Sequence, residues 1–291
     1  MIKAFIQAAR LRTLPLSVSG IIVGYSLAGF SNQTIFILAI LTTIGLQILS
    51  NFANDYGDGI KGTDSNRQGE KRLVASGVIS ASLMKQAVII TAIITFTLAI
   101  LLIYVSFKDE FAYALLFLFL GVSSIVAAIK YTVGKKAYGY SGLGDLFVFL
   151  FFGLLSTVGS YFLYTKVIYW DVFLPASSIG LLSAAVLNLN NMRDCIEDAK
   201  HNKITLVVKL GNKKSKIYHY TLISFSLICA LIYVCINYNN SLQFLFLIAF
   251  IPLVHNVIIV TKNCINKELD SELKKVALST FLFAVLFSIF N

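Results

Sequence analysis

Charged residues are scarce in this chain. Only 13% of its 291 residues are Asp, Glu, Lys or Arg, whereas 57% are hydrophobic, and the mean hydropathy is +0.81. An ordinary soluble domain carries about 25% charged residues. The shortage excludes a typical water-soluble fold and predicts an integral membrane protein.

Cysteine and histidine are few, and they are not spaced as metal ligands. The chain has four cysteines and three histidines, and neither CxxC nor HExxH occurs among them. The pattern therefore indicates neither a zinc site nor a disulfide framework. Cys195 lies in a polar stretch, but a small apolar filler is the favoured interpretation for it.

Long apolar segments make up most of the chain. A membrane-spanning helix needs about 20 predominantly apolar residues. Segments of this kind cover residues 13–30, 34–53, 84–106, 110–129, 144–164, 170–192, 217–238, 242–260 and 272–290. The sequence therefore predicts an all-α, polytopic membrane protein with nine transmembrane helices in a single domain, residues 1–291.

The distribution of positive charge predicts an orientation. Of the 24 Lys and Arg residues, all but Lys108 and Lys166 fall into five segments on one side of the nine predicted helices. Because Lys and Arg collect in cytoplasmic loops, the amino terminus is predicted inside and the carboxyl terminus outside. Topology explains the net charge of +10 without a nucleic-acid partner. The first apolar run is long and contains Pro15, so we expect a retained helix and no cleaved signal.

A first polar cluster ends the apolar segment that begins near Thr34. Asn51, Asn54, Asp55 and Asp58 stand at i, i+3, i+4 and i+7, so a continuing helix would project all four from one face. Their oxygens are hard ligands suited to Mg²⁺. The loop that follows contains another acid, Asp64, and then three cations that suit a phosphate: Arg67, Lys71 and Arg72. Taken alone, the stretch is equally typical of a solvated helix end.

A second polar cluster ends the segment over residues 170–192. Asn190, Asp194 and Asp198 stand at i, i+4 and i+8, with Arg193 between them. Two amide-and-carboxylate helix ends indicate a duplicated unit and one composite site. The predicted repeat halves are approximately 1–129 and 144–260, followed by a ninth helix over 272–290.

The loop over residues 130–145 is rich in tyrosine and lysine. It contains Tyr131, Lys135, Lys136, Tyr138 and Tyr140. The loop could close over a site, but on its own it is more typical of an aromatic belt with lysines at the membrane surface.

Together these motifs carry a family resemblance. NDYGDGIKGTD (54–64) and NNMRDCIEDAKHNKITLVVKLG (190–211) resemble the paired signature of the UbiA-type intramembrane prenyltransferases, and RLRTLPLS (10–17) and YSGLGD (140–145) extend the likeness along the chain. The branch that it resembles most prenylates 1,4-dihydroxy-2-naphthoate in menaquinone biosynthesis. Where the superfamily pattern has a third aspartate, this chain has Gly62, and an acid follows at Asp64.

The resemblance implies a reaction and a setting. A polyprenyl group would pass from an allylic polyprenyl diphosphate to 1,4-dihydroxy-2-naphthoate, with loss of CO₂ and diphosphate, to give demethylmenaquinone. The enzyme would lie in the cell inner membrane among lipid, with its site facing the cytoplasm and the isoprenoid in an apolar groove.

The residues suit that chemistry. Metal-bound diphosphate is a good leaving group, so Mg²⁺ is the expected cofactor and the four catalytic aspartates are Asp55, Asp58, Asp194 and Asp198. The predicted metal ligands are these four with Asn51 and Asp64. The predicted substrate-binding residues are Asn51, Asn54, Arg67, Lys71, Arg72, Tyr131, Lys135, Tyr138, Asn190 and Arg193. The tyrosine rings could flank a developing carbocation.

Other classes of protein fit parts of this pattern. An ion-coupled transporter can gather Asp and Asn, but near the membrane midplane and not at helix ends. A structural membrane subunit would not need two matched acidic clusters. Within the prenyltransferases, 4-hydroxybenzoate, homogentisate or a chlorophyllide are alternative acceptors.

Overall fold

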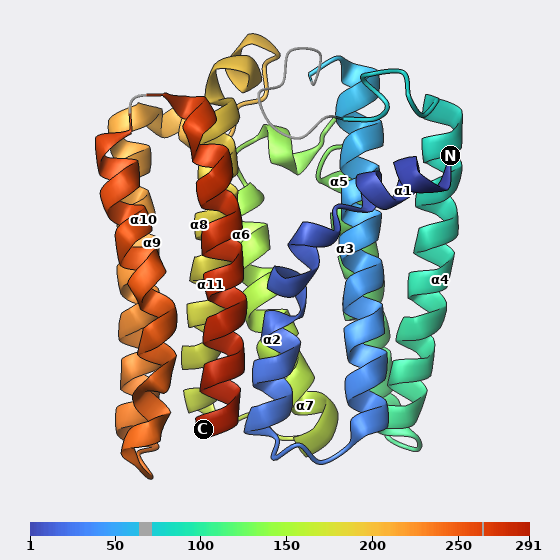
Figure 1. Ribbon diagram of the computed structural model, residues 1–291. Coiled ribbons are helices and arrows are strands. Elements are labelled where there is room, and N and C mark those ends of the chain that lie inside the picture. Colours follow the sequence, from blue (N-terminus) through green and yellow to red (C-terminus); the bar gives the residue numbers. More distant parts are fainter. Residues whose placement is uncertain (64–71, 264) are drawn as a thin grey trace.

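The structure is a computed structural model that describes residues 1–63, 72–263 and 265–291 (Figure 1). In these residues every regular element is helical and no strand forms, as predicted. The longer elements are α1 Ile2–Ala9, α2 Leu14–Leu27, α3 Gln33–Lys61, α4 Ala81–Phe107, α5 Phe111–Lys130, α6 Gly144–Val148, the π-helix η3 Phe149–Gly159, α7 Ser160–Thr165, α8 Phe173–Lys200, α9 Leu206–Ile236, η5 Ser241–Ala249, α10 Phe250–Lys262 and α11 Leu269–Phe290.

Eight helical stretches in the described residues are long and apolar enough to cross a membrane. Seven begin with α3, α4, α5, α6, η5, α9 and α11, and the eighth is Trp170–Lys200, which contains α8. They match eight of the nine predicted segments. The remaining segment, residues 13–30, forms α2, which has only 14 residues. The structure thus shows a multi-span bundle, and the count of nine spans stays a prediction.

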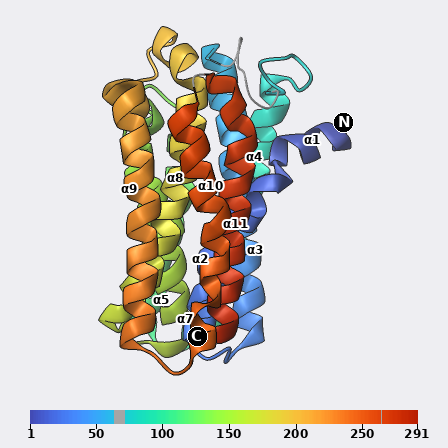
Figure 2. The ribbon, with the colours of Figure 1, turned by 60° about the vertical axis from the view of Figure 1, so that its left-hand side comes forward.

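The amino-terminal segment reaches α2 through a sharp turn. Helix α1 ends at Arg10, whose φ of 51° is left-handed, and a 3-10 turn over Leu11–Thr13 follows before α2 begins with Pro15 in its first turn. Helix α1 lies across the bundle and projects to one side of it (Figures 1 and 2). Phe5 packs edge-on against Phe52 of α3. The chain therefore enters the bundle sideways, part of the way along its length.

Helix α8 forms the centre of the main core. Ile179, Leu182, Ala185 and Leu189 are all fully buried on it, and it packs against α9, η3 and α11. Its approach to η3 is close, since a Cβ added to Gly153 would lie 2.6 Å from the Cα atom of Gly180. Small residues at such contacts let helix backbones approach within a membrane.

The helix ends that carry the two polar clusters lie at the same end of the bundle. Helices α3 and α8 both reach it with their carboxyl ends, and α11 begins there (Figure 1). The carboxyl terminus lies at the opposite end, whereas the amino terminus lies toward the end with the polar clusters (Figure 1). This shared end holds the candidate site.

Candidate active site

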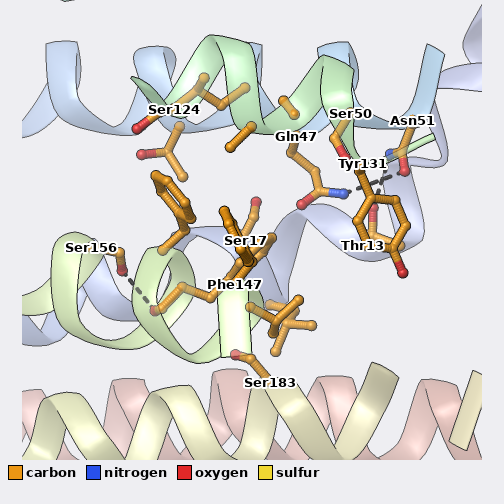
Figure 3. Close-up of a pocket in the computed structure, with 18 of the residues that line it drawn as sticks. Thr13, Ser17, Gln47, Ser50, Asn51, Ser124, Tyr131, Phe147, Ser156 and Ser183 are labelled. Carbon is orange, nitrogen blue, oxygen red and sulfur yellow. Dashed lines mark hydrogen bonds between the residues drawn. The ribbon is translucent and has the colours of Figure 1, made fainter. Parts of the chain in front are cut away.

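A cavity of about 390 Å³ opens between α2, α3, α4, α5, η3, α8 and α11. On α3 its lining runs from Ala39 to Asp58, which is roughly 28 Å at the rise of an α-helix. One end is polar, with Asp58, Arg72 and Arg193, and deeper positions such as Leu102 are apolar. Figure 3 shows part of this lining, including Tyr131 and Phe147. The shape suits a long apolar molecule with an anionic head.

Asp58 is the acidic residue of the first cluster that lines the cavity. It is 1% exposed. Its Oδ1 accepts a hydrogen bond from the hydroxyl of Tyr140 at 2.7 Å. Its Oδ2 lies 3.4 Å from Nζ of Lys203 and 3.9 Å from Nη2 of Arg72. A buried carboxylate here already interacts with two cations.

The two asparagines of the first cluster line the same cavity and hold neighbouring segments. The Asn51 amide donates to the Ala9 carbonyl at 2.9 Å and to Thr13 Oγ1 at 3.3 Å. Asn54 Oδ1 accepts from the Thr132 hydroxyl at 3.2 Å. They thereby connect α3 to the amino-terminal turn and to the loop after α5.

Asp55 is placed differently from its neighbours. Its two carboxylate oxygens accept the backbone N–H groups of Leu73 and Val74, at 3.0 and 2.9 Å, and the residue is 1% exposed. It is not part of the cavity lining. The structure therefore brings Asn51, Asn54 and Asp58 to the cavity and turns Asp55 toward residues 72–74. Its predicted role as a metal ligand stays a prediction.

Arg193 organises the second cluster. Its guanidinium makes two hydrogen bonds of 2.7 Å to Asp194, and Nη2 donates to Asn190 Oδ1 at 2.8 Å. Its Nη1 also bonds Asp270 of α11, which lies 3.9 Å from Arg12. Arg193 and Asn190 line the cavity, whereas Asp194 is buried behind the arginine.

Lys203 joins the two clusters. Its Nζ lies 3.4 Å from Asp58 Oδ2 and 3.5 Å from Asp198 Oδ1, and the residue is 8% exposed. Residues that are far apart in the chain thus contact one nitrogen atom. Lys203 therefore lies between the acidic ends of α3 and α8, where the sequence predicts a composite site.

Sequence reasoning missed several residues of the site, including Lys203 and Asp270. Lys203 follows Asp198 by five positions in the second motif, so its proximity could have been inferred. Asp270 had no such signal, because only the fold brings the start of α11 to Arg193.

The tyrosine-rich loop closes one side of the site. Tyr131 and Tyr138 line the cavity, and the Tyr138 hydroxyl donates to the Ala127 carbonyl at 2.9 Å. Burial, together with the nearby Asp58 carboxylate, raises the pKa of Tyr140. Burial also raises the pKa of Tyr131, with smaller contributions from Asp145 and Asp58. Both phenols therefore remain neutral hydrogen-bond donors at physiological pH.

Several predicted residues are not placed at this site. Asp64, Arg67 and Lys71 lie outside the described residues. Lys135 and Lys136 are exposed and do not line the cavity. The cations of the described residues that line the cavity include the predicted Arg72 and Arg193, together with Arg10, Arg12, Lys203 and Lys274.

The donor set suits a hard divalent cation. Among the described residues no three His, Cys, Asp or Glu side chains are gathered tightly enough to form a ready metal site. However, Asp58 and Asp198 already share one cationic nitrogen, and carboxylate and amide oxygens are the ligands that Mg²⁺ takes. The residues therefore fit a magnesium ion held between the two helix ends.

An apolar cavity among candidate membrane-spanning helices, with acidic helix ends and cations at one end, suits a membrane enzyme that acts on a lipid with an anionic head group. The chain belongs to the UbiA prenyltransferase family, whose family model matches residues 17–286. The family resemblance inferred from the two motifs is confirmed.

Individual relatives refine this assignment. The chain is 41% identical to a 1,4-dihydroxy-2-naphthoate octaprenyltransferase of Haemophilus influenzae, over 99% of this chain and 95% of that protein. It is 43% identical to the Escherichia coli protein of the same name, over 85% of this chain and 81% of that protein.

Solved structures support the fold. A UbiA homolog from Archaeoglobus fulgidus bound to GPP and Mg²⁺ superimposes with a TM-score of 0.69 at 12% identity, over 98% of this chain and 99% of that one. A UbiA homolog from Aeropyrum pernix K1 gives a TM-score of 0.71 at 15% identity, over 93% of this chain and 97% of that one. At these identities the likeness shows the shared fold alone.

Proposed function

We propose that this protein transfers a polyprenyl group from an allylic polyprenyl diphosphate to 1,4-dihydroxy-2-naphthoate, with release of diphosphate and CO₂. The observation that carries the proposal is the junction of the two acidic helix ends at Lys203, at the polar end of an apolar cavity. The names of the relatives at 41% and 43% identity support the naphthoate as acceptor.

The donor is bound at two places. Its isoprenoid chain lies along the apolar part of the cavity, where Leu102 and Phe117 contribute the lining. Its diphosphate lies at the polar end, where Arg72, Arg193 and Lys203 supply positive charge. The substrate thus aligns with the cavity from its head to its tail.

Asp58, Asp194 and Asp198 would hold Mg²⁺, with Asn54 and Asn190 nearby and with Asp64 and Asn51 as further predicted ligands. The ion supplies positive charge that neutralises the diphosphate as a leaving group. The binding residues of the chain orient the donor so that its first carbon points away from the carboxylates and into the cavity.

The proposed transfer breaks one bond in the donor and exchanges one bond at the acceptor. The carbon–oxygen bond between the isoprenoid and the diphosphate breaks, and the diphosphate leaves with the bonding electron pair. The acceptor ring carbon that bears the carboxylate forms the new carbon–carbon bond, and CO₂ leaves while its bonding electrons return to the ring. The neutral rings of Tyr131 and Tyr138 face the cavity and can stabilise the developing allylic cation. The apolar lining excludes water, which would capture that cation.

The site is proposed to face the cytoplasm of a cell inner membrane. Helices α3, α5, α8 and α10 each have a lysine in the last turn, at the end of the bundle that holds the clusters, and positive charge collects on the cytoplasmic side. The duplicated arrangement is also proposed: α3 packs most extensively against α4, and α8 against α9, so each cluster-bearing helix pairs with the next one in the chain.

Mass spectrometry of reaction products tests the proposed function. Purified protein receives Mg²⁺, a mixture of polyprenyl diphosphates, and equal amounts of 1,4-dihydroxy-2-naphthoate, 4-hydroxybenzoate and homogentisate. We expect a prenylated, decarboxylated naphthalene product, and none with EDTA or with Asp58→Asn. Prenylation of either competing acid in preference to the naphthoate would contradict the assigned acceptor.

A further inference from the structure

The turn that follows the first cluster is a compact unit. Within it Ser76 N–H donates to the Arg72 carbonyl at 3.2 Å, Gly77 N–H to Val74 at 3.0 Å, and Ile79 N–H to Leu73 at 3.1 Å. Gly77 has a φ of +72°, which glycine adopts without strain. Residues 72–79 therefore form a compact turn that is held by its own backbone hydrogen bonds.

Contacts of Asp55, Leu73 and Val74 help to attach this turn to the bundle. Asp55 accepts the backbone N–H groups of Leu73 and Val74. The Leu73 side chain is 2% exposed and packs in the core with Leu49. Val74 lies so close to α3 that a Cβ on Gly59 would be 2.7 Å from its Cγ1. Asp55 provides the directional part of this attachment.

The attached turn delivers a cation to the candidate site. Arg72 comes directly before the two N–H groups that Asp55 binds. Its side chain is 5% exposed, lines the cavity, and brings Nη2 to 3.9 Å from Asp58 Oδ2. Asp55 and Asp58 therefore have different partners. Asp58 faces the cavity, whereas Asp55 binds the backbone that carries Arg72.

We infer that Asp55 is a positioning residue that holds the 72–79 turn so that the Arg72 guanidinium meets the diphosphate of the donor. An ionised carboxylate can accept two backbone N–H groups at once, whereas an amide oxygen and its NH₂ partner cannot. This is a chemical reason for an aspartate next to Asn54 that does not depend on metal binding. The inference rests on the proposed function only for the identity of the ligand as a diphosphate.

The test compares Asp55→Asn with Asp58→Asn, Arg72→Ala and the double variant Asp55→Asn with Arg72→Ala. Asp171→Asn is the matched control, since Asp171 accepts a hydrogen bond from Asn237 at 3.1 Å near the first residues of α8, away from the site. Three measurements are made on full-length protein: amide hydrogen exchange over residues 72–79, the rise in melting temperature with Mg²⁺, and the Kd for inorganic diphosphate in the presence of Mg²⁺.

Asp55→Asn is expected to speed exchange over 72–79 and to keep the Mg²⁺-dependent rise in melting temperature, which Asp58→Asn loses. Its Kd for diphosphate should rise on the order of tenfold, as for Arg72→Ala, because one charge-assisted contact is lost in each. The double variant should be no weaker than Arg72→Ala, since Asp55 acts through Arg72. In steady-state assays the KM for the donor should rise more than kcat falls.

The inference is wrong if Asp55→Asn loses the Mg²⁺ response together with Asp58→Asn, since that result makes Asp55 a metal ligand as the sequence suggested. Unchanged exchange over 72–79, or an unchanged Kd for diphosphate, also overturns it. A lack of prenylated product from the unaltered protein would instead contradict the proposed function, and the exchange and diphosphate measurements would still decide the role of Asp55.

Discussion

Lys203 occupies a position in which a single ammonium group balances two buried carboxylates. Its side chain is 10% exposed, and those of Asp58 and Asp198 are 1% and 8% exposed. Removal of one partner from a buried group of charges leaves the others uncompensated, which costs more than the loss of an exposed pair. A divalent cation at the same place would replace this compensation.

Lys203→Met is therefore expected to destabilise the metal-free protein. The free energy of unfolding should fall by about 3 kcal/mol in EDTA, enough to lower Tm by several degrees. Added Mg²⁺ should restore more stability to this variant than it adds to the unaltered protein, because the ion meets carboxylates that no lysine neutralises. Thermal unfolding with Mg²⁺ and with EDTA measures both effects.

Lys200→Met provides the control for that experiment. Lys200 carries the same charge three positions earlier and pairs with Glu197 at 2.7 Å, but its side chain is 61% exposed. Exposed pairs contribute little to stability. If the two variants show equal Tm values in EDTA, Lys203 does not compensate the buried carboxylates.

The residue scale also shows what spacing alone can predict. The i, i+3, i+4, i+7 pattern correctly predicted that Asn51, Asn54 and Asp58 share a face toward one cavity. It could not predict the side chain of Asp55, because that is decided by the backbone of Leu73 and Val74, which return to α3 after the intervening loop. The helical period predicts the direction in which each side chain leaves the helix, but it does not predict which group that side chain contacts.

At the scale of elements, the two helix ends behave as one electrostatic unit. The carboxyl end of α3 brings Asp58 and that of α8 brings Asp198, and both contact the segment between α8 and α9 through Lys203. In the proposed function the same two carboxylates bind one metal–diphosphate complex. If both carboxylates are needed to hold this complex, loss of either one removes most of the effect of the other.

Asp58→Asn and Asp198→Asn should consequently be non-additive. Each single change is expected to lower kcat/KM for the donor on the order of a hundredfold or more, because each removes a charged ligand. The double variant should be only slightly worse than either one. Asp109→Asn, at an exposed position between α4 and α5, is the control. Effects that multiply in the double variant would show that the helix ends act independently.

Most elements followed from hydrophobic runs, and the exceptions have physical reasons. The segment over 144–164 was predicted as one span, which it is, but η3 within it is π-helical and meets α8 at Gly153 and Gly180. Run length carries no information about hydrogen-bond register, so the π-helix had no sequence signal. Likewise, α2 is shorter than the predicted segment 13–30 because it ends at Leu27, just before Gly29 and Phe30, whose φ values of 73° and 53° are left-handed; hydropathy alone does not reveal this.

At the scale of the whole molecule, charge and site coincide. Helices α3, α5, α8 and α10 end with Lys61, Lys130, Lys200 and Lys262 at the end of the bundle that holds the site. Lys108 and Lys166 lie toward the other end, where Lys166 donates to the Ser106 carbonyl. An orientation with the site in the cytoplasm is the one that the asymmetry favours.

Cysteine labelling in sealed cells tests that orientation. After replacement of the native cysteines, single cysteines are introduced at Ser76, Asn212 and Asn239, all of which are exposed. Positions 76 and 212 flank the site, and position 239 follows α9 at the far end of the bundle. A membrane-impermeant maleimide should label position 239 in intact cells, and positions 76 and 212 only after the membrane is opened.

Helix α9 connects positions 212 and 239, so labelling of both from outside would contradict its span across the membrane. If only positions 76 and 212 are labelled from outside, the bundle spans the membrane in the opposite orientation, and the donor site lies on the face away from the cytoplasm.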